Sequence, residues 1–257
     1  MSARSLALVL VLGLGATAAA QQRGGGAPAA PPLSAWAAAH FDLTGYWVPV
    51  ITEDWRTRMT TAPRGDYAGV PLSPEGRRIA DAWDPAGDAG DLACRAYGVG
   101  GLLRLPLRLH ITWADDQTLR IDSDAGQQAR LLRFTTAPPP GEPTWQGQSA
   151  ARWEKQQQAR GFAPRVPSDG PGVLKVVTKG MRPGYLRRNG VPYSGDAVIT
   201  EYFVRHSDFG TDWFTVVTTV DDPRYLARPF ITSTHFKREA NAASWNPRPC
   251  EVVPPIG

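Results

Sequence analysis

The segment from Arg182 to Tyr193 concentrates side chains that could bind a charged or aromatic molecule. Its twelve residues include three arginines, two tyrosines and one asparagine, with two prolines and two glycines that would shape a stiff, turning loop. Guanidinium groups form forked hydrogen bonds with carboxylates and phosphates, and tyrosine rings stack on planar molecules. The segment is therefore either a gate, in which Arg182, Arg188 and Tyr193 bind a ligand, or a structural loop whose arginines pair with nearby acids.

Glu201 is the second candidate because it interrupts an apolar stretch that covers residues 197–204. Strand alternation places it on one face with Ile199 and Phe203. A carboxylate among apolar side chains is unfavourable unless it is paired. Glu201 is therefore either a general base on a cavity, with Tyr185 as its acid–base partner, or the acidic half of a buried ion pair with an arginine.

Three histidines, His110, His206 and His235, lie on or at the edge of predicted strands. Three imidazoles with one open position would suit zinc. No two of them have close ligand spacing, so we predict no metal site and no cofactor. His110 and His235 are assigned, together with Trp113, to the ligand-binding residues.

Short stretches of alternating apolar and polar residues must position these side chains. Most are joined by turns that contain Gly, Asp or Pro, and their number and spacing predict an all-β fold, an antiparallel barrel or a sandwich. One helix is expected to begin at Ser73 and Pro74 and to end before Asp84. The predicted strands cover residues 46–51, 107–113, 118–122, 128–134, 144–148, 150–155, 173–179, 197–205, 213–220 and 229–237.

The beginning of the chain has the order of a secretory signal peptide. A positive charge at Arg4 precedes the apolar run from Leu6 to Leu14, and small residues end at Ala20. The run is too short to span a bilayer. We expect residues 1–20 to be a signal peptide, with a mature chain that begins near Gln21. Residues 21–40 are predicted to be a flexible Gly/Ala/Pro tether and residues 41–257 a single β-barrel domain.

Composition and cysteine usage agree with export. The formal net charge is only +4 and the charged residues are scattered, so no nucleic-acid partner is expected. No second long apolar stretch follows the signal, so we predict no membrane span. Cys94 and Cys250 are the two cysteines. In an oxidising periplasmic or extracellular compartment an even count favours a disulfide over two free thiols.

Gly45-Tyr46-Trp47 resembles the G-x-W opening of lipocalins and other calycins, where the tryptophan packs across the barrel base. This resemblance implies a calycin-like antiparallel β-barrel of about ten strands with one short helix. Four segments also resemble a large, poorly characterised family of exported bacterial proteins. That resemblance implies export and a β-rich barrel, and it transfers no mechanism. The four segments are residues 42–47, 144–149, 181–193 and 221–226.

Taken together, the sequence predicts an exported barrel, monomeric or dimeric, that binds a small, partly apolar or aromatic ligand. The alternative is a cofactor-independent lyase, isomerase or hydrolase in which Glu201 and Tyr185 work in the barrel cavity. A structural or interaction protein of the cell envelope is the third possibility. Convergence of Glu201, residues 182–193 and a histidine on one pocket would favour the enzyme. An apolar pocket would favour the binding protein, and a filled barrel the structural protein.

Overall fold

The computed structural model describes residues 33–135, 141–155 and 172–256 of the 257-residue chain. The expected signal peptide, the cleavage point at Gln21 and residues 21–32 of the expected tether lie outside these ranges. Within them, none of the helices has the length and hydrophobicity needed to cross a bilayer.

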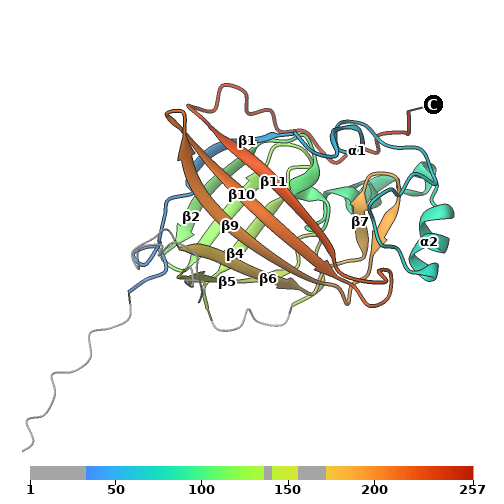
Figure 1. Ribbon diagram of the computed structural model, residues 1–257, viewed down its shortest axis with the longest axis horizontal. Coiled ribbons are helices and arrows are strands. Elements are labelled where there is room, and N and C mark those ends of the chain that lie inside the picture. Colours follow the sequence, from blue (N-terminus) through green and yellow to red (C-terminus); the bar gives the residue numbers. More distant parts are fainter. Residues whose placement is uncertain (1–32, 136–140, 156–171, 257) are drawn as a thin grey trace, which may run out of the picture. The chain divides into compact units, whose positions relative to one another are not determined.

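Nine strands close into a β-barrel in the order β1-β11-β10-β9-β6-β5-β4-β3-β2 (Figure 1). This confirms the all-β barrel with few helices. One ladder corrects the expectation of an antiparallel barrel, because β4 and β5 run parallel, with Leu132 opposite Ser149. The strands are β1 Gly45–Val50, β2 Leu109–Asp115, β3 Thr118–Ser123, β4 Ala129–Arg133, β5 Gln148–Glu154, β6 Val173–Lys179, β9 Val198–Asp208, β10 Thr211–Asp221 and β11 Phe230–Glu239.

Two expected elements differ from the structure. Of residues 144–148, only Gln148 belongs to a strand, as the first residue of β5; residues 144–147 form a turn in which Gly147 has a left-handed backbone (φ 60°) and Thr144 forms an isolated bridge with Met181. Residues 182–193, expected to be a loop, contain a hairpin of β7 (Gly184–Arg187) and β8 (Val191–Tyr193). These strands are too short to give a clear period-two pattern in the sequence.

The helix expected at Ser73 is α2, which spans Pro74–Asp81. The Ser73 hydroxyl accepts a hydrogen bond from the Gly76 amide at 3.0 Å, as an N-cap residue should. Sequence analysis did not predict the remaining helical segments. They are α1 Trp55–Met59 and the 3₁₀ helices η1 Pro85–Gly87, η2 Gly90–Tyr97 and η3 Leu102–Arg104.

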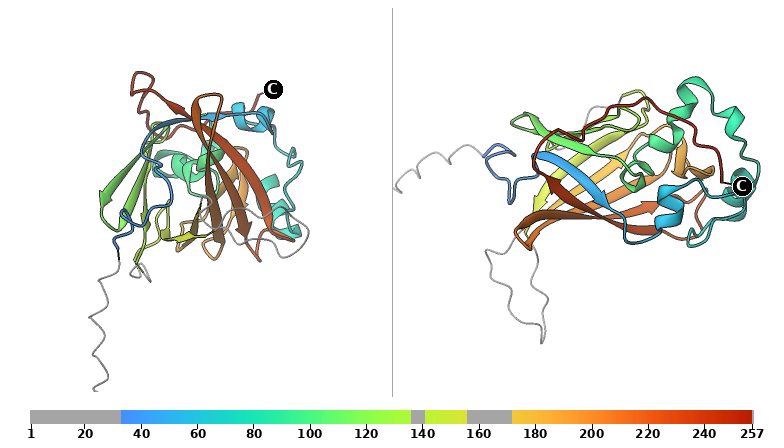
Figure 2. Two further views of the ribbon diagram at one scale, coloured as in Figure 1. Left: turned by 60° about the vertical axis from the view of Figure 1, so that its left-hand side comes forward. Right: turned by 90° about the horizontal axis from the view of Figure 1, so that it is seen from above.

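A cap closes one end of the barrel; we use this name for residues 85–105, the β7–β8 hairpin and α2 (Figure 1). Figure 2 shows the same end from two further directions. Tyr97, Leu102 and Leu103 pack into the apolar core of the barrel. Gly100 allows the cap to pack this tightly, since an added Cβ would lie 2.7 Å from the Tyr193 ring.

At the other end, residues 33–41 pack against the barrel. The Trp153 indole donates a hydrogen bond to the Ala35 carbonyl at 3.0 Å, and the His40 ring stacks on the same indole. Ala35 is 7% exposed. Residues 33–40, which sequence analysis assigned to the tether, therefore contact the folded domain because Trp153 and the edge of the barrel bind them.

Side chains fill the barrel lumen. In addition to apolar layers, the lumen contains an ion pair between Arg130 of β4 and Glu201 of β9, whose side chains are 2% and 0% exposed. Both guanidinium Nη atoms of Arg130 donate to the two Glu201 carboxylate oxygens. The hydroxyls of Ser149 and Thr178 accept the remaining Arg130 hydrogen bonds. The apolar lumen residues with 0% exposure include Trp47, Leu109, Ile111, Leu132, Leu174, Val176, Phe203, Phe214 and Phe236.

The pair predicts a large stability loss for Glu201→Gln, because the substitution leaves the Arg130 charge buried without its counter-charge. We expect unfolding to become easier by about 3–5 kcal/mol in urea denaturation. The matched control is Asp122→Asn in the more exposed Arg120–Asp122 pair, with a loss of about 1 kcal/mol or less. The double variant Arg130→Met/Glu201→Leu should recover most of the loss. A Glu201→Gln protein with an unchanged urea midpoint would contradict this role.

Candidate functional site

The two residues of the predicted acid–base pair lie in separate hydrogen-bond networks. Glu201 pairs with Arg130 inside the barrel, whereas the Tyr185 hydroxyl, in the cap, donates to the Asp88 carboxylate at 3.0 Å. Burial and the Asp88 charge raise the pKa of Tyr185 to about 12, so its phenol stays protonated at neutral pH. Arg95 also donates to Asp88, at 2.9 Å. No hydrogen bond between described residues joins the two networks.

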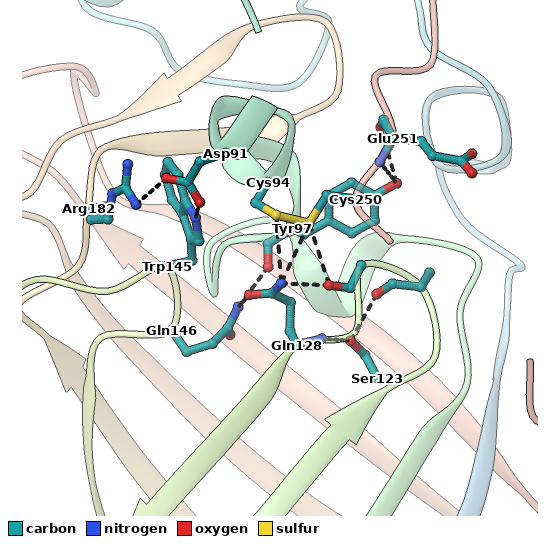
Figure 3. The surroundings of a disulfide bond; sticks show 12 residues. Asp91, Cys94, Tyr97, Ser123, Gln128, Trp145, Gln146, Arg182, Cys250 and Glu251 are labelled. Carbon is teal, nitrogen blue, oxygen red and sulfur yellow. Dashed lines mark hydrogen bonds and ion pairs between the residues drawn. A yellow bond between two sulfur atoms is a disulfide. The ribbon is translucent and has the colours of Figure 1, made fainter. Parts of the chain in front are cut away.

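The predicted gate residues occupy three different environments. Arg182 lies 3.9 Å above the Trp145 ring and pairs with Asp91 at 2.6 Å, so its charge is already compensated (Figure 3). Tyr193 is 0% exposed, and burial raises the pKa of its hydroxyl. Arg188 alone among them lines the cavities described below.

The other predicted ligand-binding residues do not meet in one place. His110 stacks on Tyr46 with ring centroids 4.2 Å apart, on the face of β2 opposite the lumen residues. His235 shares a hydrogen bond of 2.9 Å with the Thr215 hydroxyl. Trp113 packs against Phe134 in the apolar cluster. Among the described residues, no group of three or more His, Cys, Asp or Glu side chains is arranged to hold a metal ion.

Two neighbouring cavities lie at the cap, outside the barrel lumen. One of them, which we call the cap cleft, has a volume of about 220 Å³. Its walls come from four parts of the chain that are far apart in sequence: η2 with the residues after η3, the turn between β3 and β4, the residue after β7, and the C-terminal segment 248–253. The lining residues are Tyr97, Leu105, Pro106, Ala125, Arg188, Arg248, Pro249, Glu251 and Val253.

A disulfide between Cys94 of η2 and Cys250 attaches the C-terminal wall to the cap, as predicted, with the two Cα atoms 5.1 Å apart (Figure 3). The Tyr97 hydroxyl donates to the Glu251 carbonyl at 3.2 Å. The Arg248 amide donates to the Asp124 carbonyl at 2.8 Å. One covalent bond and two hydrogen bonds therefore fix the segment that forms the outer wall of the cleft.

A second, smaller cavity of about 20 Å³ adjoins the cap cleft, and Leu105 and Arg188 line both. We call it the arginine pocket, because its walls include Arg58, Arg104, Arg187 and Arg188. Sequence analysis identified only Arg188 of this set as a binding residue. Arg58 lies in α1, a helix that the sequence pattern did not predict. Arg104 lies 46 residues further along the chain, in η3, so no local pattern could have grouped the two arginines.

The guanidinium groups of this pocket are buried and only partly bonded. Arg58 is 2% exposed; its Nη1 pairs with Glu53 at 2.5 Å and its Nε donates to the Arg104 carbonyl at 3.0 Å. Desolvation and the neighbouring Arg104 charge lower the pKa of Arg58 to about 10. Arg58 Nη2, Arg187 Nη1 and Arg188 Nε are buried without a hydrogen-bond partner among the described residues. The walls of the pocket therefore include three arginines, each with one buried donor that lacks an acceptor among the described residues.

These observations define the class of the protein as a closed β-barrel with a packed lumen and a cleft on its capped end. No family model, curated protein or solved structure matches the chain.

The disulfide predicts a coupling between oxidation state and the wall of the cleft. The Cys94→Ser/Cys250→Ser variant should lose up to about 5 kcal/mol of stability, because the closed loop is long. Amide hydrogen exchange should rise most in residues 248–256, while the barrel strands keep their relative protection. A reducing agent should reproduce the effect in the wild type and do nothing to the double variant. Equal exchange of residues 248–256 in both proteins would contradict the assignment.

Proposed function

We propose that this protein is an exported binding protein that holds a small, partly apolar molecule in the cap cleft. The cleft itself is the observation on which the proposal depends. Its volume of about 220 Å³ suits a compact ligand, and its lining combines apolar side chains with a few polar groups. Leu105, Pro106 and Val253 offer the apolar surface, and Tyr97 adds an aromatic ring.

The packed lumen supports a site at the cap in preference to one inside the barrel. Arg130 and Glu201 satisfy each other there, and neither lines the cap cleft or the arginine pocket. A ligand in the lumen would have to displace this ion pair together with 0%-exposed apolar side chains such as Phe203 and Phe214. Removing close-packed core contacts is costly, whereas the cap cleft is already open.

A wider groove of about 310 Å³ over β1 is the competing location. Its lining includes Val48, Ile51 and Met59, and the Met59 side chain is half exposed. The cap cleft differs because it adjoins a pocket lined by arginines whose positive charges could orient a ligand. We therefore place the ligand at the cap.

Filling the cap cleft should abolish binding without affecting the barrel. Val253→Trp puts a large ring into the cleft from its outer wall, and we expect the affinity for the neutral fluorophore N-phenyl-1-naphthylamine to fall by about tenfold or more. Ile231→Trp is the matched control, since Ile231 is 63% exposed on β11 and lines none of the cavities described above. Fluorescence titration measures both. Unchanged affinity in Val253→Trp, or an absence of binding in the wild type, would overturn the proposal. Native mass spectrometry of protein purified from its own periplasm would identify the natural ligand.

The proposal includes export, for which the disulfide and the signal-like N-terminus are the support. We expect N-terminal sequencing of the secreted protein to begin at or near Gln21. A mature protein that retains the apolar run from Leu6 to Leu14 would contradict this part of the proposal.

A further inference from the structure

Four guanidinium groups surround the arginine pocket, and only two carboxylates compensate them directly. Glu53 pairs with Arg58 and Arg104, and Asp54 pairs with Arg104 at 2.6 Å. Arg187 and Arg188 form no ion pair with any carboxylate among the described residues. Four positive and two negative charges leave an excess of two positive charges around one small cavity.

The donors without acceptors are the second, independent observation. Arg58 is 98% buried by side-chain area, and its Nη2 has no partner. Arg187 Nη1 and Arg188 Nε are in the same situation, and all three arginines line the pocket. A buried charged donor that lacks an acceptor is unfavourable, and native proteins seldom retain one without a reason. A negatively charged group in the pocket would offset the excess positive charge of these side chains.

Backbone carbonyls fix the orientation of three of the four groups, those of Arg58, Arg104 and Arg188. Arg58 Nε donates to the Arg104 carbonyl at 3.0 Å, and Arg188 Nη2 donates to the Arg58 carbonyl at 2.8 Å. Arg104 Nη1 donates to the Ser233 carbonyl at 2.7 Å. Because the guanidinium planes are held before a ligand arrives, little side-chain entropy would be lost on binding.

The ionisation of the arginines agrees with this reading. Burial lowers the pKa of Arg187 and of Arg188, as it does for Arg58. Their charged forms are therefore destabilised in the structure as it stands. A bound anion would reverse this shift, since a nearby opposite charge favours the charged form.

We propose that the arginine pocket binds the carboxylate of a small organic acid whose apolar body lies in the adjoining cap cleft. This rests on the proposed function and names the ligand class. The pocket volume of about 20 Å³ has room for roughly one water-sized group, so the anionic end must be small. Leu105 and Arg188 line both cavities, which places the charged end and the apolar end of one molecule within reach of each other.

A matched pair of ligands tests the carboxylate. 2-Naphthylacetate and 2-naphthylacetamide have nearly the same shape and differ in charge, and each is measured as a competitor of N-phenyl-1-naphthylamine. At constant ionic strength we expect the wild type to prefer the acid by about tenfold or more, because charge-assisted forked hydrogen bonds are the strong ones. Arg187→Met should remove this preference while the amide binds as before, since Arg187 lines only the arginine pocket of the two cavities.

Two control variants distinguish a specific loss of binding from a general loss of folding. Arg187→Lys retains the positive charge and should keep part of the preference for the acid. Arg64→Met removes one exposed positive charge outside the pocket and should keep all of it. Melting temperatures of all variants show whether each one is folded.

The outcomes separate this inference from the proposed function. If the fluorophore binds but the wild type takes acid and amide equally well, the carboxylate proposal is overturned and the cap cleft remains a binding site. If the fluorophore does not bind at all, the proposed function fails. In that case an acetate- or phosphate-dependent rise in melting temperature, lost in Arg187→Met, would support a site for a free anion. Without such a rise the anion site is overturned as well.

Discussion

The burial of a single charge pair constrains this barrel more than any other interaction. Arg130 and Glu201 pair inside the lumen at 2% and 0% exposure, and Arg130 also donates to the hydroxyls of Ser149 and Thr178. A buried charge tolerates neither the loss of its partner nor a change in geometry. The strands that carry the pair must therefore keep their register, and the lumen must stay filled. The lumen of this closed barrel is therefore occupied by its own side chains.

The cleft that we propose as the binding site lies at the cap, outside the filled lumen. Its apolar residues Tyr97, Leu102 and Leu103 complete the barrel core, and its outer side meets the C-terminal segment. The bond between Cys94 and Cys250 fixes that segment, so one wall of the cleft is covalently attached to the other. The site thus depends on the barrel for its floor and on the disulfide for its outer wall.

Much of the barrel was readable from local patterns, because strand alternation reports directly on which face is buried. The strand at residues 173–179 was predicted with its observed bounds, and Glu201 was predicted to share one strand face with Ile199 and Phe203, all three of which are buried. The elements that were not predicted are too short or too irregular to show a hydrophobic period in the sequence. The β7–β8 hairpin is three or four residues per strand, and η2 is a 3₁₀ helix in a Gly- and Ala-rich stretch.

The sequence by itself indicated an all-β fold, placed Glu201 on one face with Ile199 and Phe203, and favoured a disulfide between the two cysteines, since each depends on residue type, alternation or count. Only the tertiary structure decided which arginine forms the ion pair with Glu201. It also decided that one pocket is lined by Arg58, Arg104, Arg187 and Arg188. These residues come from α1, η3 and the end of β7, and only closure of the barrel and packing of the cap bring them together. Local periodicity cannot report such long-range contacts, because it shows only which face of a segment is buried. It does not show which distant residue packs against that face.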